Sequence, residues 1–171
     1  GGISCGVGVM KRCAQMKLFF PLSILVLAAD FSSKKMMLSL LFFPPRKIEL
    51  TPFFSLTPVW NSGISFGLFS ENPYIGLVTI PVLAVAVVLW LIWQLHELNR
   101  LQTMGAASIA GGALGNVLDR LVYGRVVDFL DFHVGVWHWP AFNLADSALF
   151  IGVLLWFHGM MHSNQTETPK A

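Results

Sequence analysis

Charged residues are scarce in this chain, and cysteines are scarcer. Asp, Glu, Lys and Arg make up 12% of the 171 residues, whereas hydrophobic residues make up 55%. A typical soluble domain has about 25% charged residues, so this chain has too little polar surface for a water-soluble globule of its size. Two cysteines exclude a disulfide-rich scaffold, and the hydrophobic content excludes a disordered chain. The composition predicts an integral membrane protein.

The chain also lacks the sequence signs of nucleic-acid or metal binding. Its formal net charge of +2 is spread along the sequence without a Lys/Arg run. It has no HExxH motif. His133 and His138 lie between two aspartates and could contribute to a zinc site, but they flank Trp137 in a segment typical of a membrane interface. We therefore expect no nucleic-acid partner, no metal and no cofactor.

Apolar segments predict four membrane-spanning helices, because a span needs about 20 predominantly apolar residues. Segments 74–93, 101–118 and 142–161 have that length. The first apolar segment becomes long enough over 17–34, since lysines at its ends can reach the interface. Residues 36–43 are either a continuation of this first helix or a short interfacial piece.

The predicted fold is an all-α membrane protein, a bundle of four transmembrane helices. Between the first and second helices, residues 47–69 alternate in polarity and predict short strands at the membrane surface. Residues 124–140 are expected to form a loop. We expect one membrane domain over 14–162, a disordered lead over 1–13, and a polar tail over 163–171.

Helix parity places all five aspartates on one side of the membrane. With four spans, the ends of the first and third helices share a side with the starts of the second and fourth. The aspartates at these positions are Asp30, Asp119, Asp128, Asp131 and Asp146. Lys and Arg divide five against six between the two sides, so the positive-inside rule does not orient the bundle.

The third helix carries two rows of small residues at a spacing of four, which places each row on one helix face. The rows are Ala107, Gly111, Gly115, Asp119 and Ser108, Gly112, Asn116, Arg120. The glycines favour close helix packing. A buried amide is costly in lipid, so Asn116 suggests a functional role.

Several aspartates could form a catalytic carboxylate pair. Asp128 lies between apolar residues, which predicts a raised pKa. Two adjacent carboxyl groups can share one proton, so that one acts as base and the other as acid, as in aspartic proteases. Asp119, Asp131 and Asp146 are the possible partners. For Asp146, the alternative is a capping role beside Asn143 at the start of the fourth helix.

Four sequence blocks together resemble one family. They are Asn-Ser-Gly-Ile-Ser-Phe-Gly at 61–67, Gly-Ala-Leu-Gly-Asn-Val-Leu-Asp-Arg at 112–120, Val-Val-Asp-Phe at 126–129, and Phe-Asn-Leu-Ala-Asp at 142–146. Their order and their positions relative to the four helices resemble lipoprotein signal peptidase, the signal peptidase II of bacteria. The resemblance extends from about residue 30 to the end of the fourth helix.

This resemblance implies an aspartic endopeptidase that removes signal peptides from lipid-modified prolipoproteins, cutting before the diacylglyceryl-cysteine. It implies Asp128 and Asp146 as the catalytic pair. The implied substrate-binding residues are Asn61, Gly63, Asn116, Arg120 and Asn143, and the implied structural support is Asp30, Lys34 and Asp119. It further implies a multi-pass protein of the bacterial inner membrane, in contact with lipid and monomeric, with an extracytoplasmic site and a β-cradle over 47–69.

Three positions depart from the family pattern. Phe31 occupies a position that is usually Gln, Ile64-Ser65 replaces Ala-Ala, and Trp60 stands where a basic residue is common. These departures keep an inactive homologue as one alternative. A non-enzymatic transporter or scaffold is the other, although a transporter predicts ionisable residues near the middle of the bilayer.

Overall fold

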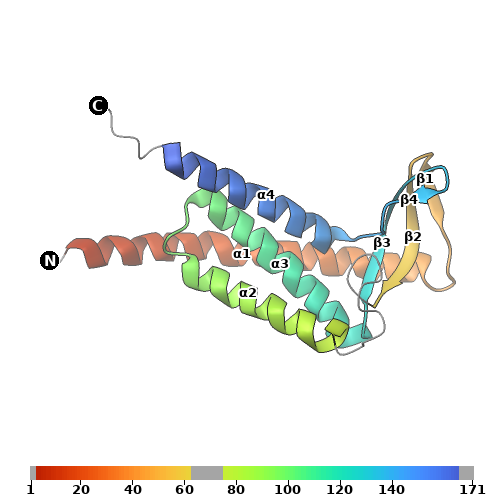
Figure 1. Cartoon of the computed structure of the whole chain (residues 1–171). Coiled ribbons are helices and arrows are strands. Elements are labelled where there is room, and N and C mark those ends of the chain that lie inside the picture. The colour runs from red at the N-terminus through yellow and green to blue at the C-terminus, as the bar shows by residue number, and fades with distance from the viewer. Residues whose placement is uncertain (1–2, 63–74, 166–171) are drawn as a thin grey trace.

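Four helices run alongside one another, with a small sheet at one end, in the computed structural model, which describes residues 3–62 and 75–165 (Figure 1). The elements are α1 (Ile3–Leu41), β1 (Ile48–Thr51), β2 (Phe54–Asn61), a π-helical turn η2 (Ile75–Thr79), α2 (Ile80–Gln94), α3 (Arg100–Tyr123), β3 (Val126–Val134), β4 (Trp137–His138) and α4 (Leu144–Gln165). The α2–α3 connection lies at the end opposite the sheet (Figure 1). The chain is thus a mostly helical protein with one sheet end and one end without a sheet.

Three of the helices are long and apolar enough to cross a membrane. The spanning segments are Lys11–Leu41, Leu77–Gln94 and Leu144–His162. The other helix, α3, is the interior helix of the bundle, because it packs against α1, α2 and α4 and half of its residues are buried. Its smaller apolar content fits that position, since its neighbours rather than lipid cover it. The multi-pass membrane prediction is therefore confirmed.

The two small-residue rows of α3 face two different helices. A Cβ on Gly111 would lie 2.6 Å from the Ser23 carbonyl oxygen of α1, and one on Gly112 would lie 2.5 Å from the Ala145 carbonyl oxygen of α4. Only glycine permits backbones to approach this closely. One row therefore directs Asp119 toward α1, and the other directs Asn116 toward α4.

The sheet takes strands from two separate connections. Its order is β1-β2-β3-β4, and all neighbours are antiparallel. Strands β1 and β2 confirm that the described part of 47–69 forms short strands. The expectation of a loop over 124–140 was wrong, because β3 pairs with β2 from Asn61↔Val126 to Phe54↔Phe132. The start of β3 is buried on both faces, so it lacks the alternating pattern of a half-exposed strand.

The helix bounds differ from the expected spans mainly at α1. This helix continues through residues 36–41, which agrees with the first of the two alternatives for that stretch, a continuation of the helix. It begins at Ile3, inside the stretch that was expected to be a disordered lead. In α3, Asn99 and Gln102 form a capping box at the start, and Gly124 ends the helix in a left-handed conformation with φ of 72°. The turn at Gly124 leads directly into β3.

Candidate active site

Four of the five aspartates lie in one hydrogen-bonded network at the sheet end of the bundle. Asp30 comes from α1, Asp119 from α3, Asp128 from β3 and Asp146 from the first turn of α4. The fifth, Asp131, lies farther along β3 and bonds to Thr57 and His138 instead. Tertiary packing therefore separates the candidate acids into distinct groups.

Asn143 links Asp128 to Asp146. Its side-chain Nδ2 donates to Asp128 Oδ1 at 2.7 Å. Its backbone N–H donates to Asp146 Oδ2 at 3.2 Å, and its Oδ1 accepts from the Asp146 backbone N–H at 2.9 Å. This reciprocal pattern is that of a capping box at the start of α4. Capping and the contact with Asp128 are therefore combined in one residue, and Asn143 is fully buried.

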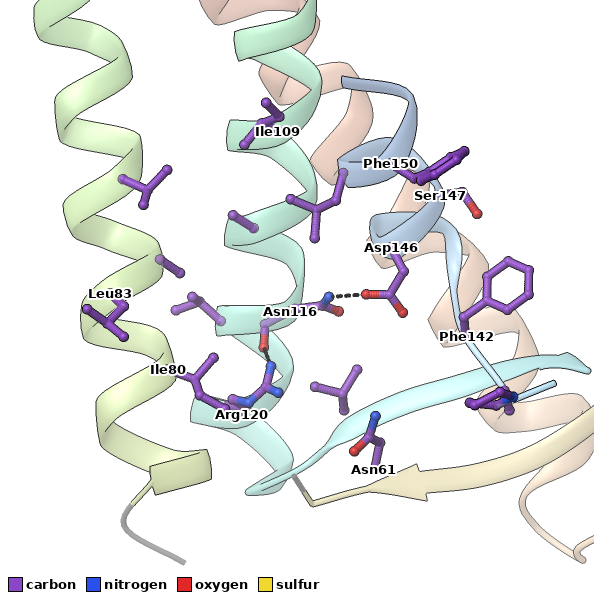
Figure 2. A pocket seen from close by; sticks show the side chains of 18 of the residues that line it. Asn61, Ile80, Leu83, Ile109, Asn116, Arg120, Phe142, Asp146, Ser147 and Phe150 are labelled. Carbon is purple, nitrogen blue, oxygen red and sulfur yellow. Dashed lines mark hydrogen bonds between the residues drawn. The ribbon is translucent and has the colours of Figure 1, made fainter. Parts of the chain in front are cut away.

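Asn116 holds the other side of Asp146. Its Nδ2 donates to Asp146 Oδ1 at 2.8 Å, as Figure 2 shows. Its Oδ1 accepts from Asn143 Nδ2 at 3.2 Å and from Lys34 Nζ at 3.0 Å. Both oxygens of Asp146 therefore accept a hydrogen bond, and the half-buried amide of Asn116 both donates and accepts.

Asp128 is 1% exposed and has a perturbed pKa. Burial raises the pKa of Asp128 to about 6, and the negative charge of Asp146 adds to the rise. Hydrogen bonds from Asn143 and from Asn61, whose Nδ2 donates to Asp128 Oδ2 at 3.0 Å, act in the opposite direction. A proton on Asp128 therefore relieves both its burial and its repulsion from Asp146.

A second acidic group surrounds Lys34. The Nζ atom of Lys34 lies 2.8 Å from Asp30 Oδ2 and 2.9 Å from Asp119 Oδ2, and all three side chains are nearly inaccessible to solvent. Asp30 Oδ1 also accepts the backbone N–H of Ala145 at 2.8 Å, and Asp119 Oδ2 accepts that of Val127 at 3.0 Å. These contacts tie α1 and α3 to the segments that carry Asp146 and Asp128.

A cavity of about 960 Å³ opens beside Asp146, between α2, α3 and α4. Side chains such as Leu83, Ile109 and Phe150 form its apolar walls, and Asn61, Asn116, Arg120 and Asp146 form its polar end (Figure 2). The guanidinium of Arg120 donates to the Asn116 carbonyl oxygen at 3.2 Å. The cavity therefore offers an apolar channel that ends at a carboxylate.

The structure brings together nine of the ten residues that the sequence analysis selected. Gly63 lies outside the described residues. Sequence reasoning missed Trp139 and Phe142 as cavity walls. Phe142 begins the 142–146 block and Trp139 lies shortly before it, so aromatic residues at a membrane interface were a signal. Over the described ranges, no group of three or more His, Cys, Asp or Glu could hold a metal ion. His133 bonds to Ser55, and His138 to Asp131.

Fold and site together define a multi-pass membrane protein with a paired-aspartate site, an arrangement that aspartic peptidases use. The family model for signal peptidase II matches residues 22–162. The chain belongs to the signal peptidase II family.

Known relatives agree with this membership. A lipoprotein signal peptidase of Burkholderia thailandensis is 50% identical over 109 residues, 63% of this chain and 66% of that protein, so the match spans just under two thirds of the relative. One from Francisella tularensis subsp. novicida is 40% identical over 141 residues, 80% of this chain and 87% of that protein. A solved bacterial membrane enzyme shares the fold, with a TM-score of 0.75 at 23% identity over 91% of this chain and 94% of its own.

Proposed function

We propose that this protein is a membrane aspartic endopeptidase that removes signal peptides from lipid-modified prolipoproteins, cutting before the diacylglyceryl-cysteine. The observation that carries the proposal is the pair formed by buried Asp128 and half-buried Asp146, joined through Asn143 at the end of an apolar cavity. Membership of the signal peptidase II family supports the same substrate class.

The carboxyl pair can perform hydrolysis with one shared proton. Asp128 is the more deeply buried member and has the raised pKa, so it holds the proton. Asp146 lines the cavity and, as carboxylate, takes a proton from a water that attacks the scissile carbonyl carbon. Asp128 gives its proton to the carbonyl oxygen. As the C–N bond breaks, the amine leaves with the proton from Asp146, and Asp128 regains one from the diol.

The surrounding residues suit a substrate that remains partly in the membrane. The apolar walls from α2, α3 and α4 accept a lipid chain or an apolar signal segment. Asn61 and Arg120 line the polar end, where N–H donors can bind the peptide carbonyls. Asn116 and Asn143 keep the pair in place, while Asp30, Lys34 and Asp119 support the segments behind it.

The fold further supports four spans and an outward-facing site in the bacterial inner membrane. In this proposal α3 crosses the bilayer as the interior helix, covered by the three apolar ones. The sheet and the carboxyl pair lie at the same end of the bundle, because Asp128 is on β3 and Asp146 is in the first turn of α4. In this proposal, substrates whose mature part is exported reach that end. Since one chain supplies both carboxyl groups and the cavity, a monomer suffices.

Cleavage of a lipid-modified precursor by the purified protein in lipid tests the proposal. We expect Asp128→Asn and Asp146→Asn to lower kcat by about 10⁴-fold while the protein stays folded and inserted, because each removes one of two cooperating groups. Glu97→Gln is the matched control, since Glu97 is exposed at the opposite end of the bundle. A chelator should leave cleavage unchanged. Normal processing by either Asn variant contradicts the proposal.

A further inference from the structure

A second groove lies on the sheet next to the cavity. It has a volume of about 580 Å³ and is lined mainly by aromatic side chains, among them Phe132, Trp137, Trp139 and Phe142. Trp139 and Phe142 also line the large cavity beside Asp146. The groove is therefore continuous with the candidate active site.

Phe132, which lines the groove, and Asp128 lie on the same face of β3. Side chains alternate along a strand, so Asp128, Leu130 and Phe132 point to one face. At the edge of β3 the Leu130 backbone pairs with Phe142, directly before Asn143. The Phe132 ring stacks on the Phe142 ring with centroids 6.0 Å apart and planes 14° apart, and it also contacts Phe54. A row of rings thus leads along the strand away from Asp128.

Polar contacts hold the hairpin of β3 and β4 in its conformation. Asp131 accepts hydrogen bonds from Thr57 Oγ1 at 2.9 Å and, at its other oxygen, pairs with His138 Nδ1 at 2.8 Å. Ser55 Oγ lies 2.7 Å from His133 Nε2. Burial acts against ionisation of Asp131, but the hydrogen bonds from His138 and Thr57 lower its pKa. The groove is therefore preformed rather than induced.

The aromatic side chains that line the groove are exposed, and they lie beyond the ends of the helices. Trp137 is 64% exposed, Trp139 53% and Phe132 43%. A contiguous exposed aromatic surface beside a cleft is typical of a binding site. It extends past the apolar cavity between the helices, on the elements outside the spanning segments.

We propose that this groove is a substrate subsite that binds the first residues after the modified cysteine, with a preference for an apolar or aromatic side chain. The inference rests on the proposed function. The cavity between the helices suits the signal segment and the lipid, whereas the segment that leaves the membrane must pass over the sheet. The groove is an aromatic pocket of side-chain size on that path.

Two precursors that differ at one position test this subsite. One has Phe and the other Ser at the second residue after the modified cysteine. We expect Phe132→Ala and Trp137→Ala to lower kcat/KM about tenfold for the Phe precursor, through KM, and to leave the Ser precursor within twofold. Trp137→Phe should keep most of the preference for the Phe precursor that Trp137→Ala loses. Trp93→Ala is the control, because Trp93 is 62% exposed and lies near the C-terminal end of α2, away from the sheet.

The outcomes separate the possible roles of the groove. Equal loss on both precursors indicates that the aromatic surface seats the protein on the bilayer, and it overturns the subsite. Unchanged kcat/KM for both precursors in both variants also overturns it. Failure of the unaltered protein to cleave either precursor instead contradicts the proposed function, so the two failures are distinguishable.

Discussion

Four aspartates form two neighbouring groups whose charges have different partners. Asp30 and Asp119 share the ammonium of Lys34, at 2.8 and 2.9 Å. Asp128 and Asp146 are held by uncharged amides, chiefly those of Asn143 and Asn116. A cation offsets the negative charge of carboxylates directly, whereas neutral amides provide hydrogen bonds without a positive charge. This difference agrees with the proposed roles, in which one group supports the fold and the other transfers protons.

Removal of the cation is expected to have the largest effect on stability. Lys34→Met leaves Asp30 and Asp119 buried without a positive charge, which should cost about 3–5 kcal/mol of unfolding free energy. Thermal or denaturant unfolding in detergent measures the loss. Lys35→Met is the control, because Lys35 is exposed and contacts only the rings of Phe31 and Tyr123 among the interactions described. Equal losses of unfolding free energy in both variants would show that the Asp30–Asp119 group does not depend on the charge of Lys34.

A mutation in the carboxyl pair should raise the stability of the protein at neutral pH, whereas Lys34→Met lowers it. Asp128 has a pKa of about 6 in the fold against 3.8 in the unfolded chain. Between these values the folded state binds more protons, so its stability falls as pH rises from about 4 to 6. Asp128→Asn should therefore be more stable than the unaltered protein at pH 7, by up to about 3 kcal/mol, and equally stable near pH 4.

Unfolding midpoints of both proteins across pH 4 to 8 test this sign. A variant that is less stable at pH 7 would show that the surroundings of Asp128 stabilise its charge in the fold. Activity would still be lost, so stability and activity should change in opposite directions at this residue.

A smaller effect is expected at Asn61, which donates to Asp128 Oδ2. This bond lowers the pKa of Asp128, the proton donor of the proposed mechanism, so Asn61→Ala should move the alkaline limb of the pH profile upward. Loss of the cavity-lining amide should also reduce kcat/KM about tenfold below that limb. Thr57→Val on the same strand is the control, because Thr57 bonds to Asp131. An unshifted pH profile in Asn61→Ala would show that Asn61 does not act through Asp128.

Much of the architecture could be predicted from the sequence. Apolar segments of bilayer length are required by lipid, and they are visible without tertiary information. The strand Val126–Val134 was missed for a physical reason. Val127 and Phe129 pack in an apolar cluster with Met37 and Leu41, while Asp128 on the other face is also buried, so neither face shows the polarity of a surface strand.

The number of spans and the positions of the aspartates along the chain sufficed to place these residues at one end of the bundle. Each crossing of the bilayer reverses the side on which the chain emerges. Which acids pair could not follow from order. Asp119, Asp128 and Asp146 all lie at that end, and their grouping depends on contacts between α1, α3, β3 and α4. The two faces of α3 send Asp119 toward Lys34 and Asn116 toward Asp146. Hydrogen bonds form only over about 3 Å, so the packing of the side chains selects the pair.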